Sequence, residues 1–65
     1  MKYWLTINDS VPEEQARAIW DDIKRFEPNM TVLYDKIYVY GETRPEIVSK
    51  IAETIENAGV KVERE

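Results

Sequence analysis

The chain has 65 residues, and we expect one small domain over residues 1–65. It contains no cysteine and no histidine, so disulfides, thiolate chemistry, zinc-finger sites and imidazole catalysis are excluded. Nine basic and thirteen acidic residues give a net charge of −4, which makes nucleic acid and anionic membranes unfavourable partners.

The first predicted element is a strand over residues 2–7, where apolar side chains alternate with others. One face carries Tyr3, Leu5 and Ile7, and the other carries Lys2, Trp4 and Thr6. This start does not resemble a signal peptide, and no apolar run approaches the roughly 20 residues of a membrane span. We therefore expect a soluble, cytoplasmic protein, with no membrane partner.

A helix is predicted over residues 11–26. Ser10 and Glu13 have the spacing of a capping box, and Pro12 fits the first helical turn. Apolar residues three and four apart form one buried face: Ala16, Ile19, Trp20, Ile23 and Phe26. Trp20 is expected to fill a thin core, with its indole N–H near the periphery. Pro28 ends the helix, because the residue before a proline avoids helical geometry.

A hairpin is predicted next, with strands over residues 30–34 and 37–40 joined by a tight turn at Asp35-Lys36. This turn lacks the Asn-Gly or Asp-Gly pair that two-residue hairpins prefer, so the pattern does not fix the register.

A second helix is predicted over residues 44–58, with Thr43 and Glu46 as its capping box and Pro45 in its first turn. Gly59 is expected to stop the helix in the left-handed conformation. The last strand is predicted over residues 60–64, with Val60 and Val62 facing inward.

The two halves of the sequence repeat each other. The apolar face of the second helix follows that of the first at an offset of 32: Val48, Ile51, Ala52, Ile55 and Ala58. Two such halves in the order βαββαβ predict an α+β, ferredoxin-like two-layer sandwich. We expect a four-stranded antiparallel sheet in the order 4-1-3-2, with both helices on one face and the other face open.

This topology predicts a candidate binding surface on the open face. The central strands would turn Leu5, Ile7, Ile37 and Val39 toward the helices, with Thr31, Lys61 and Glu63 flanking the open face. The candidate open-face residues are Trp4, Thr6, Leu33, Tyr38 and Tyr40. Aromatic residues on two central strands resemble the RNA-recognition motif, which stacks bases there. That resemblance implies base stacking by Trp4, Tyr38 and Tyr40.

The resemblance is one of geometry, because "KIYVYGE" (36–42) lacks the glycines of that family's motif. The net negative charge also has the wrong sign for a phosphate binder. Two alternatives remain. The aromatic residues could simply be good strand formers on a half-exposed surface, or the face could bury itself in a weak homodimer.

The second half, "IYVYGETRPEIVSKIAETIENAGVKVE" (37–63), resembles heavy-metal-associated domains, including its "ENAGVKVE" ending. That family binds metal through Cys-x-x-Cys, which this chain lacks, so the fold carries over and the metal site does not. Asn8, Asp9 and Asp35 could hold a hard cation weakly, although solvated loop and cap positions explain them better.

We expect no enzyme, no catalytic residue and no cofactor. Acylphosphatases share the predicted fold but need an arginine-bearing phosphate loop, and "NDSVPEE" (8–14) has no basic residue. Asp21 and Asp22 are adjacent on a helix and point in different directions, so they do not make a carboxylate pair. Ser10 and Thr43 are explained as N-caps.

Capping boxes, first-turn prolines, a glycine stop and clean strand alternation all agree in this sequence. The leading hypothesis is therefore an engineered or redesigned ferredoxin-like scaffold with no evolved function. The alternative is a small natural module that uses the open face for a protein partner, self-association or single-stranded nucleic acid. Asn29, Met30 and the unfavoured turn suit a natural protein or a retained natural backbone.

Overall fold

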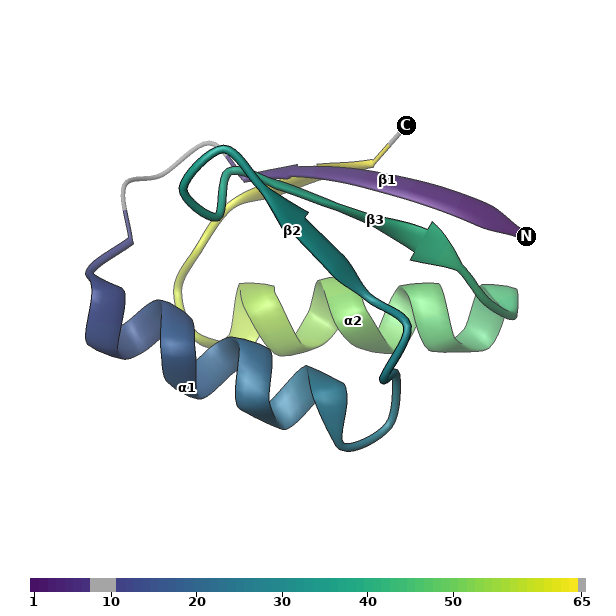
Figure 1. The fold of residues 1–65 in the computed structure, drawn as a ribbon, viewed down its shortest axis with the longest axis horizontal. Coiled ribbons are helices and arrows are strands. Elements are labelled where there is room, and N and C mark those ends of the chain that lie inside the picture. The colour runs from purple at the N-terminus through teal and green to yellow at the C-terminus, as the bar shows by residue number, and fades with distance from the viewer. Residues whose placement is uncertain (8–10, 65) are drawn as a thin grey trace.

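A computed structural model describes residues 1–7 and 11–64. The elements are β1 (Lys2–Ile7), α1 (Glu13–Lys24), β2 (Thr31–Leu33), β3 (Tyr38–Glu42), α2 (Pro45–Asn57) and β4 (Val62–Arg64). The strands form one antiparallel sheet in the order β2-β3-β1-β4, and both helices lie under the same face (Figure 1). Read from the other edge this order is 4-1-3-2, so the predicted ferredoxin-like fold is confirmed.

The strand register decides which side chains share a face, because directly opposite residues point the same way. On β1 and β3, Trp4 lies opposite Tyr40 and Thr6 lies opposite Tyr38. On β2, Leu33 also lies opposite Tyr38. The three strands therefore bring their aromatic and small side chains together on the face away from the helices.

The core lies between the sheet and the helices, and the predicted helical faces are confirmed except that Phe26 and Ala58 are only half-buried. The buried core side chains on the helices are Ala16, Ile19, Trp20, Ile23, Val48, Ile51, Ala52 and Ile55. From the sheet they meet Tyr3, Leu5, Ile7 and Val39. Burial of one large aliphatic side chain contributes about 1.5–3 kcal/mol, so these layers supply the main stabilising term.

The second helix does not begin with its predicted capping box. The N-cap of α2 is Arg44 instead of Thr43, and it makes no side-chain capping bond. Arg44 is extended (φ −75°, ψ 150°), because the residue before a proline avoids helical geometry, and this moves the helix start past Thr43. The backbone N–H of Thr43 donates to the carbonyl oxygen of Met1 at 2.8 Å.

The first helix also begins later than predicted. Its N-cap is Pro12, which is extended at ψ 145° and makes no side-chain cap bond, and Ser10 lies outside the described residues. The last turn tightens before Pro28, where the N–H groups of Phe26 and Glu27 both donate to the Ile23 carbonyl. Phe26 is consequently half-buried beyond the helix end, 4.5 Å below the Lys50 ammonium.

At the other end of the chain, Gly59 has the predicted left-handed conformation (φ 85°) and donates its N–H to the Glu56 carbonyl. β4 begins at Val62, two residues after the predicted start. Val60 is buried and Val62 half-buried, so both still pack on the core.

The turn between β2 and β3 differs from the prediction. Tyr34, Asp35 and Lys36 all have positive φ (50°, 53° and 73°), so both strands stop short of the turn. The Ile37 N–H donates to the Tyr34 carbonyl at 3.2 Å, which closes the turn. Because the extended backbone ends at Leu33, Ile37 no longer follows the alternation and is 42% exposed instead of facing the helices.

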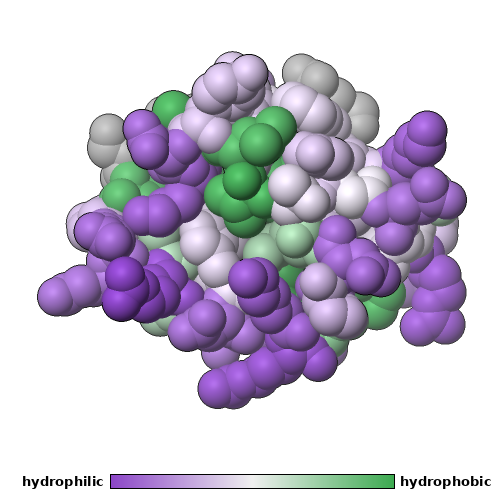
Figure 2. Space-filling view, in the orientation of Figure 1, coloured by the Kyte–Doolittle hydropathy of each residue, from purple (hydrophilic) through white to green (hydrophobic). Residues whose placement is uncertain are grey.

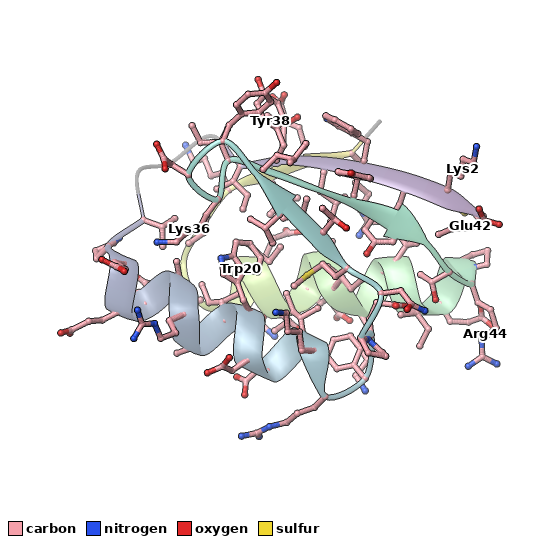
Figure 3. All side chains as sticks on the ribbon, in the orientation of Figure 1. Lys2, Trp20, Lys36, Tyr38, Glu42 and Arg44 are labelled. Carbon is pink, nitrogen blue, oxygen red and sulfur yellow. The ribbon has the colours of Figure 1, made fainter. Side chains whose placement is uncertain are left out.

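Trp20 is as buried as predicted, but its indole N–H does not reach the periphery. Its Nε1 is buried and has no hydrogen-bond partner among the described residues. Figure 3 shows the ring between α1 and the sheet. The large ring fills the space between the layers, and this leaves its polar atom inside.

Candidate binding face

The open face carries a cluster of four aromatic side chains, which we call the aromatic cluster: Trp4, Tyr34, Tyr38 and Tyr40. Trp4 and Tyr40 are stacked, with ring centroids 5.2 Å apart and ring planes 18° apart. Tyr38 is tilted against Trp4 at 5.7 Å and receives Tyr34 edge-on at 5.4 Å. The tyrosines of the open face therefore face one another and the indole.

This arrangement differs from a base-stacking platform. A base needs an aromatic ring with an exposed face. Tyr40 covers one face of the Trp4 indole, and Trp4 covers one face of the Tyr40 ring. Both rings, like Tyr38, are only partly exposed. Much of the stacking capacity of the cluster is used within the protein.

The structure places all five predicted surface residues on the open face. Trp4, Tyr38 and Tyr40 form the centre of the cluster, Thr6 lies opposite Tyr38, and Leu33 lies on the other side of it. Figure 3 shows Tyr38 standing on the side of the sheet away from the helices. Glu63 lies opposite Thr6 and so flanks this face, as predicted.

Tyr34 belongs to the cluster but was not predicted to. It is 70% exposed, the most exposed large apolar side chain of the described residues. A two-residue alternation assigns it to the same side as Val32, because the pattern assumes an extended backbone. Its left-handed conformation turns it toward Tyr38, and no feature of the local sequence signals that change.

A shallow hollow of about 580 Å³ adjoins the stacked pair. It is lined by Lys2, Tyr3, Trp4, Tyr40, Gly41 and Glu42. Lys2 and Glu42 are exposed and lie opposite each other on β1 and β3. Figure 3 shows both at the end of the sheet away from Tyr38. The hollow thus joins an aromatic wall to one positive and one negative side chain.

Tyr3, which helps to line this hollow, carries a buried hydroxyl group. Tyr3 is buried, and its hydroxyl has no hydrogen-bond partner within the described part of the chain. Burial raises the pKa of that hydroxyl from 10.0 to about 12, and the negative charge of Glu27 adds to the rise. The Glu27 carboxylate is itself buried and accepts the Asn29 N–H at 2.9 Å, which satisfies it locally.

Charge separates the two layers of the protein. Figure 2 shows hydrophilic residues gathered over the helices, while the sheet side is paler and carries a hydrophobic area near its middle. Exposed acids and bases on the helices form short-range pairs, Glu13 with Arg17 and Asp22 with Arg25. The two helices together hold seven acidic and three basic residues, whereas the four strands hold two of each, so the negative charge of these elements lies on the helices and away from the aromatic cluster.

Residues 1–7 and 11–64 contain no cluster of side chains that could bind a metal ion. These residues include no group of three or more acids that could hold a metal ion. Asn8 and Asp9, which the sequence pairs with Asp35 as weak cation ligands, lie outside the described residues. Among the described helices, none is long and apolar enough to cross a membrane.

No family model, curated protein or solved structure matches this chain.

Proposed function

We propose that this chain is a non-catalytic binding module whose working surface is the aromatic cluster, and that its partner is a weakly charged protein segment. One observation carries the proposal. The cluster combines a half-exposed indole and phenols with Tyr34, which is 70% exposed, on a face that the helices leave uncovered. Tryptophan and tyrosine are enriched in protein interfaces, because each gives a large apolar contact and one polar atom.

The charges around the cluster favour an uncharged partner over a strongly charged one. The neighbouring hollow offers Lys2 and Glu42 together, so neither sign of charge dominates at its rim. A protein segment with apolar side chains and backbone amides matches such a surface, since it fills the hollow and leaves no charge unpaired.

Single-stranded nucleic acid fits the same surface less well. The net charge of −4 opposes a polyanion, and the stacked Trp4–Tyr40 pair leaves fewer ring faces for bases. A phosphate backbone would also require a basic track, which the mixed Lys2, Glu42 and Glu63 rim does not supply.

The second candidate is an engineered or redesigned scaffold with no evolved activity. The mutual stacking of the aromatic rings favours it, because the cluster then needs no ligand to explain it. Within residues 1–7 and 11–64, three features weigh against an idealised design: the N-cap residues Pro12 and Arg44 make no side-chain cap bond, two buried polar atoms have no partner, and three non-glycine residues have positive φ. We therefore place the binding module first.

The test is an NMR spectrum of backbone amides and indoles with three additions. These are more of the protein itself, a pool of short uncharged peptides rich in apolar residues, and a pool of short single-stranded DNA at low salt. Trp20 is an internal control, because its indole is buried in the core. The matched variant is Trp4→Thr/Tyr38→Thr/Tyr40→Thr, which keeps strand-forming residues on the sheet.

Shifts of the Trp4 indole and of the β1 and β3 amides with the peptides, with Trp20 unmoved and with the same amides unmoved in the triple variant, would support the proposal. Shifts only with DNA would replace it by nucleic-acid binding. Shifts of the Trp4 indole with protein concentration alone would make the cluster a homodimer surface. A Trp4 indole signal unchanged by all three additions would favour the scaffold.

A further inference from the structure

The two edge strands of the sheet differ in charge. β4 is charged, with Glu63 and Arg64 in the strand and Lys61 just before it. β2, at the opposite edge, has no charged residue anywhere in 29–34. Charged side chains on an edge strand discourage pairing with another strand. β2 lacks that protection, and Figure 2 shows a hydrophobic area over it on the near face.

The register indicates which backbone groups of β2 point outward. The Ile7 N–H donates to the Ile37 carbonyl at 2.7 Å, which makes Thr6–Tyr38 a non-hydrogen-bonded pair of β1 and β3. Tyr38 therefore turns its backbone groups to Leu33 on β2. Because these groups alternate along a strand, Val32 turns its N–H and C=O to the open edge of the sheet.

The flank of α1 nearest this edge carries alternating charges. Gln15 donates to the Ala58 carbonyl at the end of α2, so this side of α1 faces the other helix. The opposite flank, spaced three and four apart, carries Glu13, Arg17, Asp21 and Lys24, all exposed. α2 contacts β4, which leaves α1 over the β2 half of the sheet.

The charges on this flank of α1 are complementary to those on a second, antiparallel copy of the same flank. Its signs run −, +, −, + from Glu13 to Lys24, so two antiparallel copies that are centred on one another place every acid opposite a base. The spacing also fits. Two helices cover four strands, so each helix covers the width of two strands. Because neighbouring strands lie about 4.8 Å apart, this width is about 9.6 Å. A second copy joined at β2 would place its α1 at the same interval, within the 8–10 Å at which helices pack.

We propose that two copies of this chain associate through β2, forming a continuous eight-stranded sheet in which the two α1 helices lie antiparallel. Val32 of each copy pairs with Val32 of the other on the two-fold axis. β2 has only three residues, so the dimer is weak and forms as concentration rises. Both aromatic clusters then lie on the same face, with their surfaces still accessible. This proposal is independent of what the clusters bind.

The experiment is sedimentation equilibrium from micromolar to millimolar protein, with a charge exchange on α1. The acidic variant is Arg17→Glu/Lys24→Glu, and the basic variant is Glu13→Lys/Asp21→Lys. In a solution of one variant alone, the two facing α1 flanks carry charges of the same sign and repel each other. We therefore expect the dissociation constant of the dimer to rise roughly tenfold or more. An equimolar mixture should restore the dimer as a heterodimer. Circular dichroism at low concentration checks that each variant is folded.

Two controls separate this interface from others. Arg44→Glu/Arg64→Glu changes the net charge as the acidic variant does but lies away from β2 and α1, so it should dimerise like the unmodified chain. Replacing the outward amide hydrogen of Val32 by a methyl group, in synthetic protein, should abolish the dimer and keep the fold.

The proposal is overturned if the unmodified chain stays monomeric at millimolar concentration. It is also overturned if the acidic and basic variants dimerise like the control. Loss of the dimer in Trp4→Thr/Tyr38→Thr/Tyr40→Thr, with the α1 variants unaffected, would place the interface on the aromatic cluster instead.

Discussion

The phenol ring of Tyr3 lies over Gly41, its direct partner on the neighbouring strand. A β-carbon on Gly41 would lie 2.7 Å from the Tyr3 hydroxyl oxygen and 3.0 Å from two ring carbons. Real β-carbons do not approach heavy atoms this closely. The absent side chain of Gly41 thus makes the space in which Tyr3 is buried, and β3 needs a glycine there for packing alone.

We expect Gly41→Ala to destabilise the protein by about 1–3 kcal/mol, because the added methyl group overpacks against a buried ring. Urea unfolding measures the change. In a Tyr3→Val background the same substitution should cost much less, since valine does not reach Gly41. If Gly41→Ala stabilises the protein, the Tyr3 ring can move aside and the close contact does not limit this strand.

Alkaline pH should weaken the fold through Tyr3. Burial raises the pKa of its hydroxyl to about 12 in the folded protein, against 10.0 when unfolded. Between these values the unfolded chain loses the proton and the folded chain keeps it, so the stability present below pH 10 falls as pH rises. The loss should reach about 2 kcal/mol near pH 12.

Unfolding in urea at several pH values above 9, compared between the unmodified chain and Tyr3→Phe, measures this effect. Phenylalanine keeps the ring and removes the ionising group and its unpartnered oxygen, so it should be neutral or stabilising at neutral pH. Parallel stability curves for the two proteins across the alkaline range would show that Tyr3 ionisation is not responsible.

Trp20 should tolerate phenylalanine far better than alanine. Trp20→Phe removes a buried N–H that has no described partner, which offsets the loss of ring volume, so we expect a change within about 1 kcal/mol. Trp20→Ala leaves a large cavity and should cost about 3–5 kcal/mol. Thermal unfolding compares them. A Trp20→Phe cost close to that of alanine would reveal a partner for the indole.

The β2–β3 turn should be open to stabilisation. Asp35 and Lys36 have left-handed backbones, which non-glycine residues adopt at a cost of order 1 kcal/mol each. Asp35→Asn/Lys36→Gly supplies the pair preferred at such positions and should add about 1 kcal/mol, or roughly 4–8 °C in melting temperature. Asp35→Ala/Lys36→Ala is the matched control and should not stabilise. An unchanged melting temperature for Asn-Gly would mean that the turn is not strained.

The sequence alone determined the spacing of the apolar side chains along each element, and this spacing was enough to predict the fold. The two-residue alternation of β1 and the three-and-four spacing in both helices predicted the buried faces, the sheet order and five of the residues on the open face. These patterns are reliable because a strand or helix must bury its apolar side wherever it packs. The role of Gly59 as a left-handed helix stop was also predictable, because it depends only on the backbone conformation of that one residue.

Only the tertiary structure decided the ends of the elements and the contacts between them. Thr43 had the right spacing for a cap, but extended Arg44 before Pro45 moved the start of α2. Tyr34 joined the aromatic cluster because three successive left-handed residues ended β2. Tyr3 and Gly41 are 38 positions apart, and no local pattern relates them. Such features depend on how a neighbouring strand fills space, and that is set when the layers pack, not by the period of any one segment.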